Sequence, residues 1–312
     1  MIIITGSSGF IAGALIRKLV LEKIKNIVIC DFENQNLNQS GLTFIETHKL
    51  FSFIDSNKNS INVIYHLGAI TDTTFTDEFL LNKYNLEFSI ILWNHCVKYS
   101  IPIIYASSAA TYGDGYFGFN DNHNNIENLT PLNLYAKSKN DFDNFVLNQI
   151  KTPPYWFGLK FFNVFGFDES KKKNMSSIVY QSYNKIIRFN KMYLFKSYNK
   201  NYKDGYQERD FIYIDDVVNV LIFLINNKNS GIYNLGTGES TTFIKLIRLV
   251  FRALKIKENI KFVEMPNNLK EKYQYSTKAD MSKLRSIGYH YNFQNISSAV
   301  NDYILNYLAK KN

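Results

Sequence analysis

The chain has 312 residues, of which 46% are hydrophobic and 16% aromatic, and its formal net charge is +9. This apolar content is ample for a large core, which excludes an intrinsically disordered chain. Apolar runs such as VVNVLIFLI fall well short of the roughly 20 residues that a membrane-spanning helix needs. The lysines are spread along the whole chain, so the positive charge argues against a dedicated nucleic-acid-binding face and suits an anionic small substrate.

The cysteines and the N-terminus indicate the compartment. Cys30 and Cys96 are the only cysteines and lie in apolar stretches, so we expect no disulfide framework and a reducing cytoplasm. The start MIIITGSSG enters a strand at once, without the basic flank or cleavage site of a signal peptide. The five histidines show no spacing typical of a metal site, so we expect no metal, and we interpret His66 and His95 as structural.

Strand-length apolar segments alternate with segments of helical periodicity through the first half of the chain. The strand-like segments are MIIIT, KNIVICD, LTFIE, NVIYHLGA, PIIYASS and WFGLKFFNV. Apolar residues at helical spacing predict helices over 10–22, 85–99 and 134–150. This alternation predicts an α/β fold of Rossmann type, a doubly wound parallel sheet with crossover helices.

The alternation breaks after Asn163, where a polar, basic and Tyr-rich segment runs to residue 207. A strand and helix follow in RDFIYIDDVVNVLIFLI, with Asp215 as the expected N-cap, and then a strand in GIYNLGTG. The last third combines two helices, TTFIKLIRLVFRALK and SSAVNDYILNYLAKK, with the strand IKFVEMP. We therefore expect an NAD(P)-binding Rossmann domain over 1–163, rejoined by 210–238 and about 274–290. A smaller interleaved α/β substrate-binding domain would comprise 164–209, 239–273 and 291–312.

A Gly-rich turn links the first strand to the first helix. Gly6 allows the tight turn, Gly9 lets the backbone approach a pyrophosphate, and Ala12 is small enough for close helix–strand packing. Asp31 ends the second strand, 25 residues after Gly6 (31 − 6). A carboxylate at this position accepts hydrogen bonds from a ribose 2′-hydroxyl. This combination predicts a site for a dinucleotide. The following FENQNLNQS contains no cation for a 2′-phosphate, which favours NAD, although Lys49 could reach from the next loop and leaves NADP open.

Three residues form a candidate catalytic set. Tyr135 and Lys139 are four apart at the start of a predicted helix and share one face, so the ammonium can lower the pKa of the phenol. Ser108 ends a predicted strand 27 residues before the tyrosine (135 − 108), and its hydroxyl can hydrogen-bond an oxygen undergoing oxidation. The set predicts oxidoreduction of an alcohol by a nicotinamide cofactor.

With the Gly-rich turn, these residues make the chain similar from end to end to the extended short-chain dehydrogenases/reductases of the nucleotide-sugar epimerase/dehydratase type. Within that family it resembles the ADP-L-glycero-D-manno-heptose 6-epimerases. The resemblance is carried by YASSAATYG, PLNLYAKSK, FFNVFG, RDFIYIDDV, GIYNLGTG and KEKYQYSTKADMSKLRSIGY. The last segment, residues 270–289, is the most specific because this distal region varies with the substrate.

The resemblance implies a reaction in which tightly bound NADP or NAD transiently oxidises C6 of an ADP-heptose and re-reduces it from the opposite face. The product is a precursor of the lipopolysaccharide core heptose. Tyr135 would be the acid/base on one face, and Lys172, three residues before Met175, would serve the other. The resemblance also implies a cytoplasmic homo-oligomer that needs neither a membrane nor a nucleic acid.

Specific contacts follow from the same resemblance. The cofactor would contact Gly6, Gly9, Phe10, Ile11, Asp31, Phe32, Lys49, Leu67, Gly68, Ala69, Ile70, Thr71, Asn85, Tyr135, Lys139 and Val164. The substrate would contact Ser108, Asn163, Lys172, Asn174, Gln181, Phe195, Arg209 and Tyr273. Arg209 would pair with the diphosphate, for which a guanidinium is suited.

The chain departs from the family pattern at a few positions. Gln181 stands where a substrate-binding histidine is expected, and Asn174 where serine is usual. FKSY, residues 195–198, replaces a more acidic sequence that contains glycine, and the loop before Arg209 is several residues longer. The triplet 171–173 leaves open which lysine is the second base.

Three other functions are compatible with parts of this pattern. A nucleotide-sugar 4-epimerase uses the same Ser/Tyr/Lys set and lets the keto-sugar rotate without a second base. A 4,6-dehydratase would carry an Asp-Glu pair after the serine strand, where this chain has Ala109 and Ala110. A non-catalytic NAD(P)-binding regulator would keep the fold, but a sensor has no need of an intact catalytic set.

Overall fold

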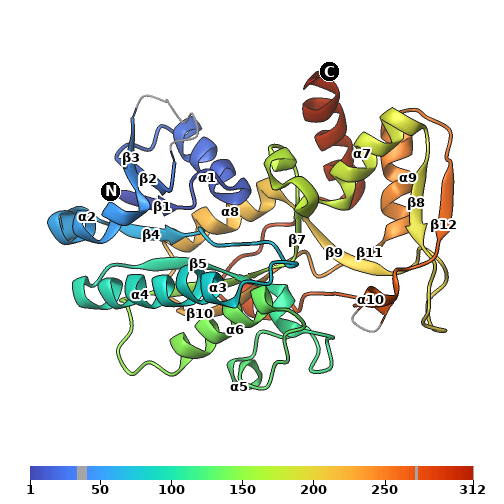
Figure 1. The fold of residues 1–312 in the computed structure, drawn as a ribbon. Helices are drawn as coiled ribbons and strands as arrows, with labels where there is room; N and C mark the ends of the chain where they lie inside the picture. The colour runs from blue at the N-terminus through green and yellow to red at the C-terminus, as the bar shows by residue number, and fades with distance from the viewer. Residues whose placement is uncertain (34–40, 271–272, 312) are drawn as a thin grey trace.

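The computed structural model of the chain describes residues 1–33, 41–270 and 273–311, apart from the side chains of Lys171, Lys173, Asn174, Asn268 and Lys311. Within these residues the chain forms one large sheet, two small sheets and the helices that cover them (Figure 1). The N-terminus lies at the large sheet, whereas the C-terminal helical segment lies beside the small sheets (Figure 1).

The large sheet has seven parallel strands in the order β10-β6-β5-β4-β1-β2-β3. Apart from the edge strand β3, its strands are mostly buried on both faces, as expected for a parallel sheet between two helical layers. The strands are β1 (Ile2–Thr5), β2 (Ile27–Asp31), β3 (Leu42–Glu46), β4 (Val63–His66), β5 (Ile103–Ser108), β6 (Trp156–Phe161) and β10 (Gly231–Leu235). The predicted doubly wound α/β fold is confirmed.

Helices cover both faces of this sheet (Figure 1). On one face α1 (Phe10–Leu21) packs against α8 (Ile214–Ile225). On the other, α4 (Phe88–Tyr99) contacts α2 (Leu50–Asn57) and α6 (Leu134–Leu147). Short helices lie in the connections: α3 (Glu78–Leu81), α5 (His123–Ile126), α10 (Asn267–Lys270) and α11 (Ser282–Ser286).

The small sheets lie to one side of the large sheet (Figure 1). One has the order β11-β9-β7 and the other pairs β12 with β8. Helix α9 contacts both α7 and α12 beside them. Their elements are β7 (Asn163–Phe165), α7 (Ile178–Phe189), β8 (Met192–Phe195), β9 (Glu208–Tyr213), β11 (Ser240–Thr242), α9 (Phe243–Ala253), β12 (Ile260–Val263) and α12 (Ile296–Asp302). The boundaries of the two predicted domains stay a prediction.

Two local predictions are corrected by the structure. The single strand expected in WFGLKFFNV is two strands, because the chain leaves β6 at Phe161 and enters β7 of another sheet at Asn163. The turn is closed by the Val164 amide, which donates to the Phe162 carbonyl at 2.9 Å. Asp215 is not the N-cap of α8: the cap is Tyr213, and the carboxylate lies in the first turn, where it faces the positive end of the helix dipole.

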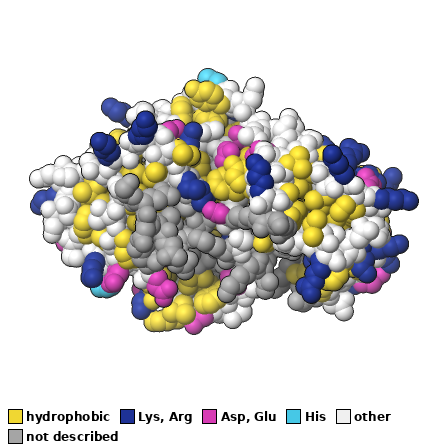
Figure 2. Space-filling view, turned by 90° about the horizontal axis from the view of Figure 1, so that it is seen from above, with side chains coloured by type: hydrophobic (Ala, Val, Ile, Leu, Met, Phe, Trp, Pro, Cys, Tyr) yellow, Lys and Arg dark blue, Asp and Glu magenta, His cyan; other side chains and the backbone are white. Residues whose placement is uncertain are grey.

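Lys and Arg side chains lie scattered among acidic and uncharged ones on the face seen in Figure 2. Among the described residues, no helix combines the length and the apolar character needed to cross a membrane.

Candidate active site

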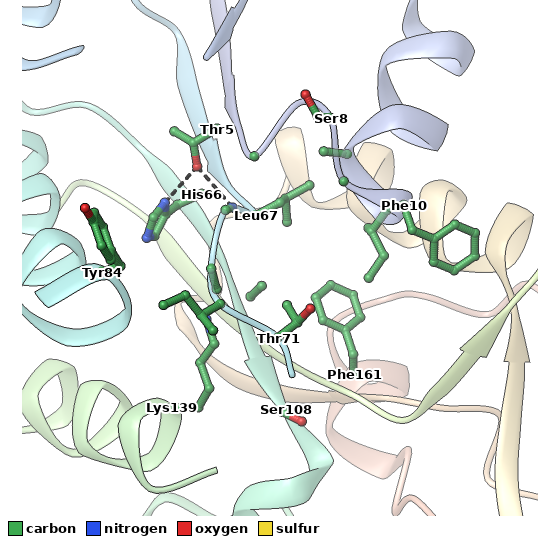
Figure 3. A pocket seen from close by; sticks show the side chains of 18 of the residues that line it. Thr5, Ser8, Phe10, His66, Leu67, Thr71, Tyr84, Ser108, Lys139 and Phe161 are labelled. Carbon is green, nitrogen blue, oxygen red and sulfur yellow. Dashed lines mark hydrogen bonds between the residues drawn. The ribbon is translucent and has the colours of Figure 1, made fainter. Parts of the chain in front are cut away.

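A cavity of about 550 Å³ opens at the carboxyl ends of the central strands. It lies where β1 pairs with β4, the point at which the strand order reverses and where ligands bind in open α/β sheets. Ser8 and Phe10 line it on one side, and Ser108 and Lys139 on the other (Figure 3). It is therefore bounded by both the Gly-rich turn and the candidate catalytic residues.

The Gly-rich turn leaves no room for side chains. Gly6 has a φ of 68°, and a Cβ there would lie 2.4 Å from the Cα of Gly68. The first-turn amides of α1 have no intrahelical acceptor, and the N-cap residue, Gly9, has no side chain to cap them. Asp31 accepts hydrogen bonds from the backbone amides of Ser8 and Phe32, both at 2.8 Å. A bare helix N-terminus facing a cavity, with a fixed carboxylate beside it, fits the pyrophosphate and ribose of a dinucleotide.

His66 ends β4 and is hydrogen-bonded to Thr5 at the end of β1, so it links these two strands beside the cavity (Figure 3). Its Nδ1 is 2.8 Å from Thr5 Oγ1 and its Nε2 is 2.9 Å from Ser89 Oγ. Because the Ser89 hydroxyl donates its one proton to the Asn85 carbonyl, it must accept from Nε2, and Nδ1 accepts from Thr5. Burial, together with the nearby Lys139 ammonium, lowers the pKa of His66 to about 3, so the ring is neutral. His66 therefore lines the cavity as a neutral, fully hydrogen-bonded ring.

Asn85 extends this hydrogen-bond network to α6, the helix that carries Tyr135 and Lys139. It lies in a π-helical stretch (Asn82–Glu87) between α3 and α4, a deviation that often marks functional sites. Its side chain bonds both backbone groups of Ile70, at 2.8 and 3.0 Å, and donates to Ser138 Oγ at 3.0 Å. Ser138 in turn donates to the carbonyl of Tyr135 at 2.8 Å. The loop after β4 is thus tied to the first turn of α6.

Ser108, Tyr135 and Lys139 all line the cavity. Ser108 is the last residue of β5, and Asn133 caps α6 by accepting from the Ala136 amide, which fixes the start of the helix. Burial lowers the pKa of Lys139 to about 8, against the opposing effect of Asp143. Burial raises the pKa of Tyr135, although a hydrogen bond with Ser108 opposes this. The lowered phenol pKa expected from the sequence is therefore not found in the chain alone, because desolvation of the phenolate dominates.

Lys172 also lines the cavity, and its position follows from a 3₁₀ helix, η5 (Glu169–Met175). Residues three apart share a face in a 3₁₀ helix, so Lys172 lies in register with Glu169 and Met175. Its Nζ is 5.2 Å from the centre of the Phe10 ring at the start of α1. Burial lowers its pKa, and the Glu169 carboxylate opposes this.

Most of the predicted cofactor residues border the cavity. Those that line it are Gly6, Gly9, Phe10, Ile11, Asp31, Phe32, Leu67, Gly68, Ala69, Ile70, Thr71, Tyr135, Lys139 and Val164. Asn85 lies behind the lining and holds Ile70. Lys49 does not line the cavity; it is exposed, with its Nζ 3.3 Å from a Glu46 carboxylate oxygen.

The predicted substrate residues divide into two groups. Ser108 and Lys172 line the cavity, whereas Asn163, Gln181, Phe195, Arg209 and Tyr273 do not, and the Asn174 side chain lies outside the described residues. Asn163 is exposed at the point where the chain changes sheets, and Gln181 donates to the Ser176 carbonyl at 2.8 Å. Among the described residues, none of these five lies in the lining that the Gly-rich turn shares with the candidate catalytic set.

Arg209 and Tyr273 meet beside the small sheets. The guanidinium carbon lies 5.5 Å from the centre of the Tyr273 ring and 5.6 Å from that of Phe243, which are cation–π distances. One nitrogen donates to the Glu208 carbonyl at 2.8 Å, and burial lowers the pKa of the guanidinium. Arg209 is thus a cation oriented by aromatic rings.

Sequence reasoning missed the supporting residues of the site. His66, which the sequence indicates as structural, also lines the cavity; its position at the carboxyl end of a strand is the available signal for this. Glu169 acts on the charge of Lys172, and Asp143 acts on that of Lys139. In the sequence, only their spacing of three and four residues from these lysines indicates such a role. The described part of the chain holds no group of three or more His, Cys, Asp or Glu side chains suited to a metal.

Comparison with known proteins identifies the family. Residues 2–236 match the model of the NAD dependent epimerase/dehydratase family. The chain belongs to this family. An ADP-L-glycero-D-manno-heptose-6-epimerase of Fusobacterium nucleatum is 40% identical over 100% of this chain and 99% of its own length. A relative of the same name from Nitratidesulfovibrio vulgaris is 36% identical over 99% of this chain and 98% of its own length.

A solved structure of this epimerase/dehydratase family extends the likeness to the fold. The Helicobacter pylori ADP-L-glycero-D-manno-heptose-6-epimerase superposes with a TM-score of 0.79 at 24% identity, covering 98% of this chain and 95% of that one. At this identity the match concerns the fold alone. The resemblance that the sequence predicted, to the epimerase family and to its ADP-heptose members, is confirmed by the full-length relatives.

Proposed function

We propose that the chain is an ADP-L-glycero-D-manno-heptose 6-epimerase that supplies the heptose precursor of the lipopolysaccharide core. The observation that carries the proposal is that Lys172 and the Ser108/Tyr135/Lys139 set line one cavity. Inversion of a carbon by oxidation and re-reduction needs a proton-transfer group on each face of the carbonyl. A 4-epimerase, in which the sugar rotates, needs only one. Full-length relatives of this name support the same choice.

The residues of the cavity can perform both proton transfers. Tyr135 takes the proton of the C6 hydroxyl as that carbon is oxidised, while Ser108 hydrogen-bonds the same oxygen. The Lys139 ammonium lies one turn further along α6, where its charge would oppose the desolvation that raises the pKa of Tyr135. Lys172 then donates a proton to the oxygen of the 6-keto sugar on its opposite face. A pKa lowered by burial suits an amine to this role, because it exchanges protons closer to neutral pH.

The site fits a nicotinamide dinucleotide, held by the Gly-rich turn, Asp31 and Lys139. When bound, NAD(P) supplies the hydride acceptor and donor for C6. We propose NAD as the preferred form, because Asp31 is placed to accept from a ribose 2′-hydroxyl. Lys139 and Lys172 are the only cationic side chains among the cavity-lining residues of the described chain. Neither adjoins Asp31 in sequence, and Lys49 is paired with Glu46.

We further propose that Arg209 and Tyr273 bind the diphosphate and the nucleoside of the substrate. Asn163, Asn174, Gln181 and Phe195 would contact the sugar. Residues 164–209, 239–273 and 291–312 would form the substrate-binding domain, which would close over the cavity. The chain would act as a homo-oligomer in the cytoplasm. The oriented guanidinium of Arg209 supports the diphosphate assignment.

One sample tests cofactor and substrate together. The purified chain is denatured, and the released dinucleotide is identified by mass spectrometry. Native protein is incubated in parallel with ADP-D-glycero-D-manno-heptose and with UDP-glucose, and both are followed by NMR. The proposal predicts released NAD and conversion of the heptose at C6 only. Conversion of UDP-glucose at C4 without conversion of the heptose would establish a 4-epimerase instead.

A further inference from the structure

The segment that carries Lys172 is closed by a single buried carboxylate. Glu169 is 0% exposed and accepts from both ends of the segment 166–177. The Gly166 amide donates at 3.3 Å, the Ser177 amide at 2.5 Å and the Ser177 hydroxyl at 2.7 Å. Ser177 is also the N-cap of α7, accepting from the Tyr180 amide. One side chain thus links the end of β7 to the start of α7.

The charge of this carboxylate acts on Lys172, although the two side chains form no ion pair within 4.0 Å in the described chain. The two residues are three apart in η5, so their side chains share a face, and the charges of Glu169 and Lys172 act on each other. Both side chains are largely withdrawn from water, which strengthens the attraction between opposite charges. Met175, three residues further, completes this face and also lines the cavity.

A second anchor holds the other side of η5. Arg17 of α1 forms a short ion pair with Asp168 and lies 4.3 Å above the ring of Phe167. Phe167 stacks on Tyr307 at 4.8 Å. These contacts fix the start of η5 to the helix whose N-terminus faces the cavity. The buried Tyr303 hydroxyl adjoins Glu169 from the C-terminal helical segment.

We propose that Glu169 is the positioning residue of Lys172: its carboxylate closes the turn that carries the lysine and supplies a negative charge near the ammonium. The inference rests on the proposed function for the reaction that Lys172 serves. Glu169 itself does not line the cavity, so it acts through Lys172 and does not touch the substrate.

The charges around Lys172 determine the direction of the expected effect. Burial lowers its pKa and Glu169 raises it, while Asp168 and Arg17 form a pair of their own and the Phe10 ring is uncharged. Glu169→Gln keeps the shape but removes the negative charge. The pKa of Lys172 should therefore fall further, and the amine should lose its proton at lower pH.

The experiment measures the titration of Lys172 without any substrate. Holoenzyme is treated with a trace of acetic anhydride at a series of pH values, and acetylation of each lysine is located by tandem mass spectrometry. We expect Glu169→Gln to lower the midpoint for Lys172 by about one pH unit. Ser177→Ala, which removes a donor but leaves the charge, should change it by less than about 0.3. The other lysines of the chain provide the reference. An unchanged Lys172 midpoint in Glu169→Gln would show that the carboxylate is only a loop-closing group.

Glu169→Asp tests positioning if the neutral variant does not fold. It keeps the charge but shortens the side chain by one methylene, so it cannot reach Gly166 and Ser177 together. We expect cofactor binding to be retained and inversion to fall by at least tenfold, with kcat affected more than KM. Wild-type turnover in Glu169→Asp would overturn the proposal. A wild type that fails to convert the heptose, while Glu169→Gln still shifts the Lys172 midpoint, would refute the proposed function but not this coupling.

Discussion

Lys160 Nζ lies 2.7 Å from Asp143 Oδ2, and both side chains are completely buried behind the catalytic helix. The carboxylate also accepts from Tyr105 and Ser107, at 3.0 and 2.6 Å, and the ammonium donates to Thr111 Oγ1 at 2.6 Å. Asp143 is four residues after Lys139 in α6, and its charge raises the pKa of that lysine. The ion pair therefore joins β5, β6 and α6, and its carboxylate acts on the charge of Lys139 in the cavity.

Asp143→Asn should destabilise the fold and alter the active site together. Leaving the Lys160 ammonium buried without a counter-ion should cost about 3–5 kcal/mol in urea unfolding. Loss of the negative charge should also lower the pKa of Lys139 below its value of about 8. The alkaline limb of the pH–activity profile should then move to lower pH. Asp141→Asn removes a partly exposed carboxylate of the same helix and should change stability by less than about 0.5 kcal/mol.

Tyr135→Phe should stop turnover and leave the fold intact. The change removes one hydroxyl from a side chain that is 8% exposed, so packing is retained. Loss of a general acid/base typically lowers turnover by about 10²–10⁴-fold. Cofactor content, read from the dinucleotide released on denaturation, should stay at the wild-type level. Epimerisation at an undiminished rate would remove Tyr135 from the mechanism.

Methionine substitutions across the triplet test which lysine is the second acid/base. Lys172→Met should preserve folding and cofactor binding yet stop inversion, because only this residue shares a face with Glu169 in η5. Lys171→Met and Lys173→Met should reduce the rate of inversion only slightly. The measurement is the rate of C6 inversion by NMR for all three proteins. Equal losses in the three would indicate a general electrostatic effect of the triplet.

His66 should contribute to unfolding in acid. Its pKa in the folded chain, about 3, is below the usual 6.5, so the unfolded chain binds an extra proton between these values. The stability from the neutral ring is therefore complete above pH 6.5 and is lost as the pH falls towards 3. At about 1.4 kcal/mol per tenfold change in proton affinity, the loss is roughly 4–5 kcal/mol. Urea unfolding at pH 7 and pH 4.5 should show this dependence in the wild type and a weaker one in His66→Gln.

Two glycines of the first βα turn should respond oppositely to alanine. At Gly6 the φ of 68° and a Cβ only 2.4 Å from the Cα of Gly68 should distort the turn and abolish cofactor binding. At Gly13 a Cβ meets only the Arg17 side chain at 3.8 Å, and alanine in a helix interior is favoured by about 1 kcal/mol. Dinucleotide content and melting temperature of the two variants check this. Full cofactor occupancy in Gly6→Ala would contradict the placement of the pyrophosphate.

Local sequence patterns predicted much of the fold and part of the site. Short apolar segments of strand length alternate with segments whose apolar residues recur at helical spacing. The parallel sheet could therefore be predicted from the sequence. Gly6, Asp31, Ser108, Tyr135 and Lys139 lie near strand ends or helix starts, and all five line the cavity. Residues at strand ends and helix starts meet at one edge of a parallel sheet. Their meeting could therefore be predicted from the sequence without knowing any long-range contact.

Other features depend on contacts that local patterns do not contain. The change of sheet at Phe162 falls inside residues 156–165, which are apolar apart from Gly158, Lys160 and Asn163, so the pattern of apolar residues shows no clear break. The resemblance indicates Lys172 but leaves its neighbours open; the three-residue period of η5, whose ends Glu169 links by bonding across eight residues to Ser177, distinguishes Lys172 from them. Likewise the network through His66 joins residues 61 and 23 positions apart in the chain.

The central claim is inversion at C6 by two acid/base groups that flank one carbon. ADP-D-glycero-D-manno-heptose is incubated with the holoenzyme in D₂O, and C6 is followed by NMR. The product should be the L-glycero epimer with protium retained at C6, because the C6 hydrogen never exchanges with solvent and only the hydroxyl proton passes through Tyr135 and Lys172. Deuterium incorporated at C6, or no inversion of this sugar, would contradict it.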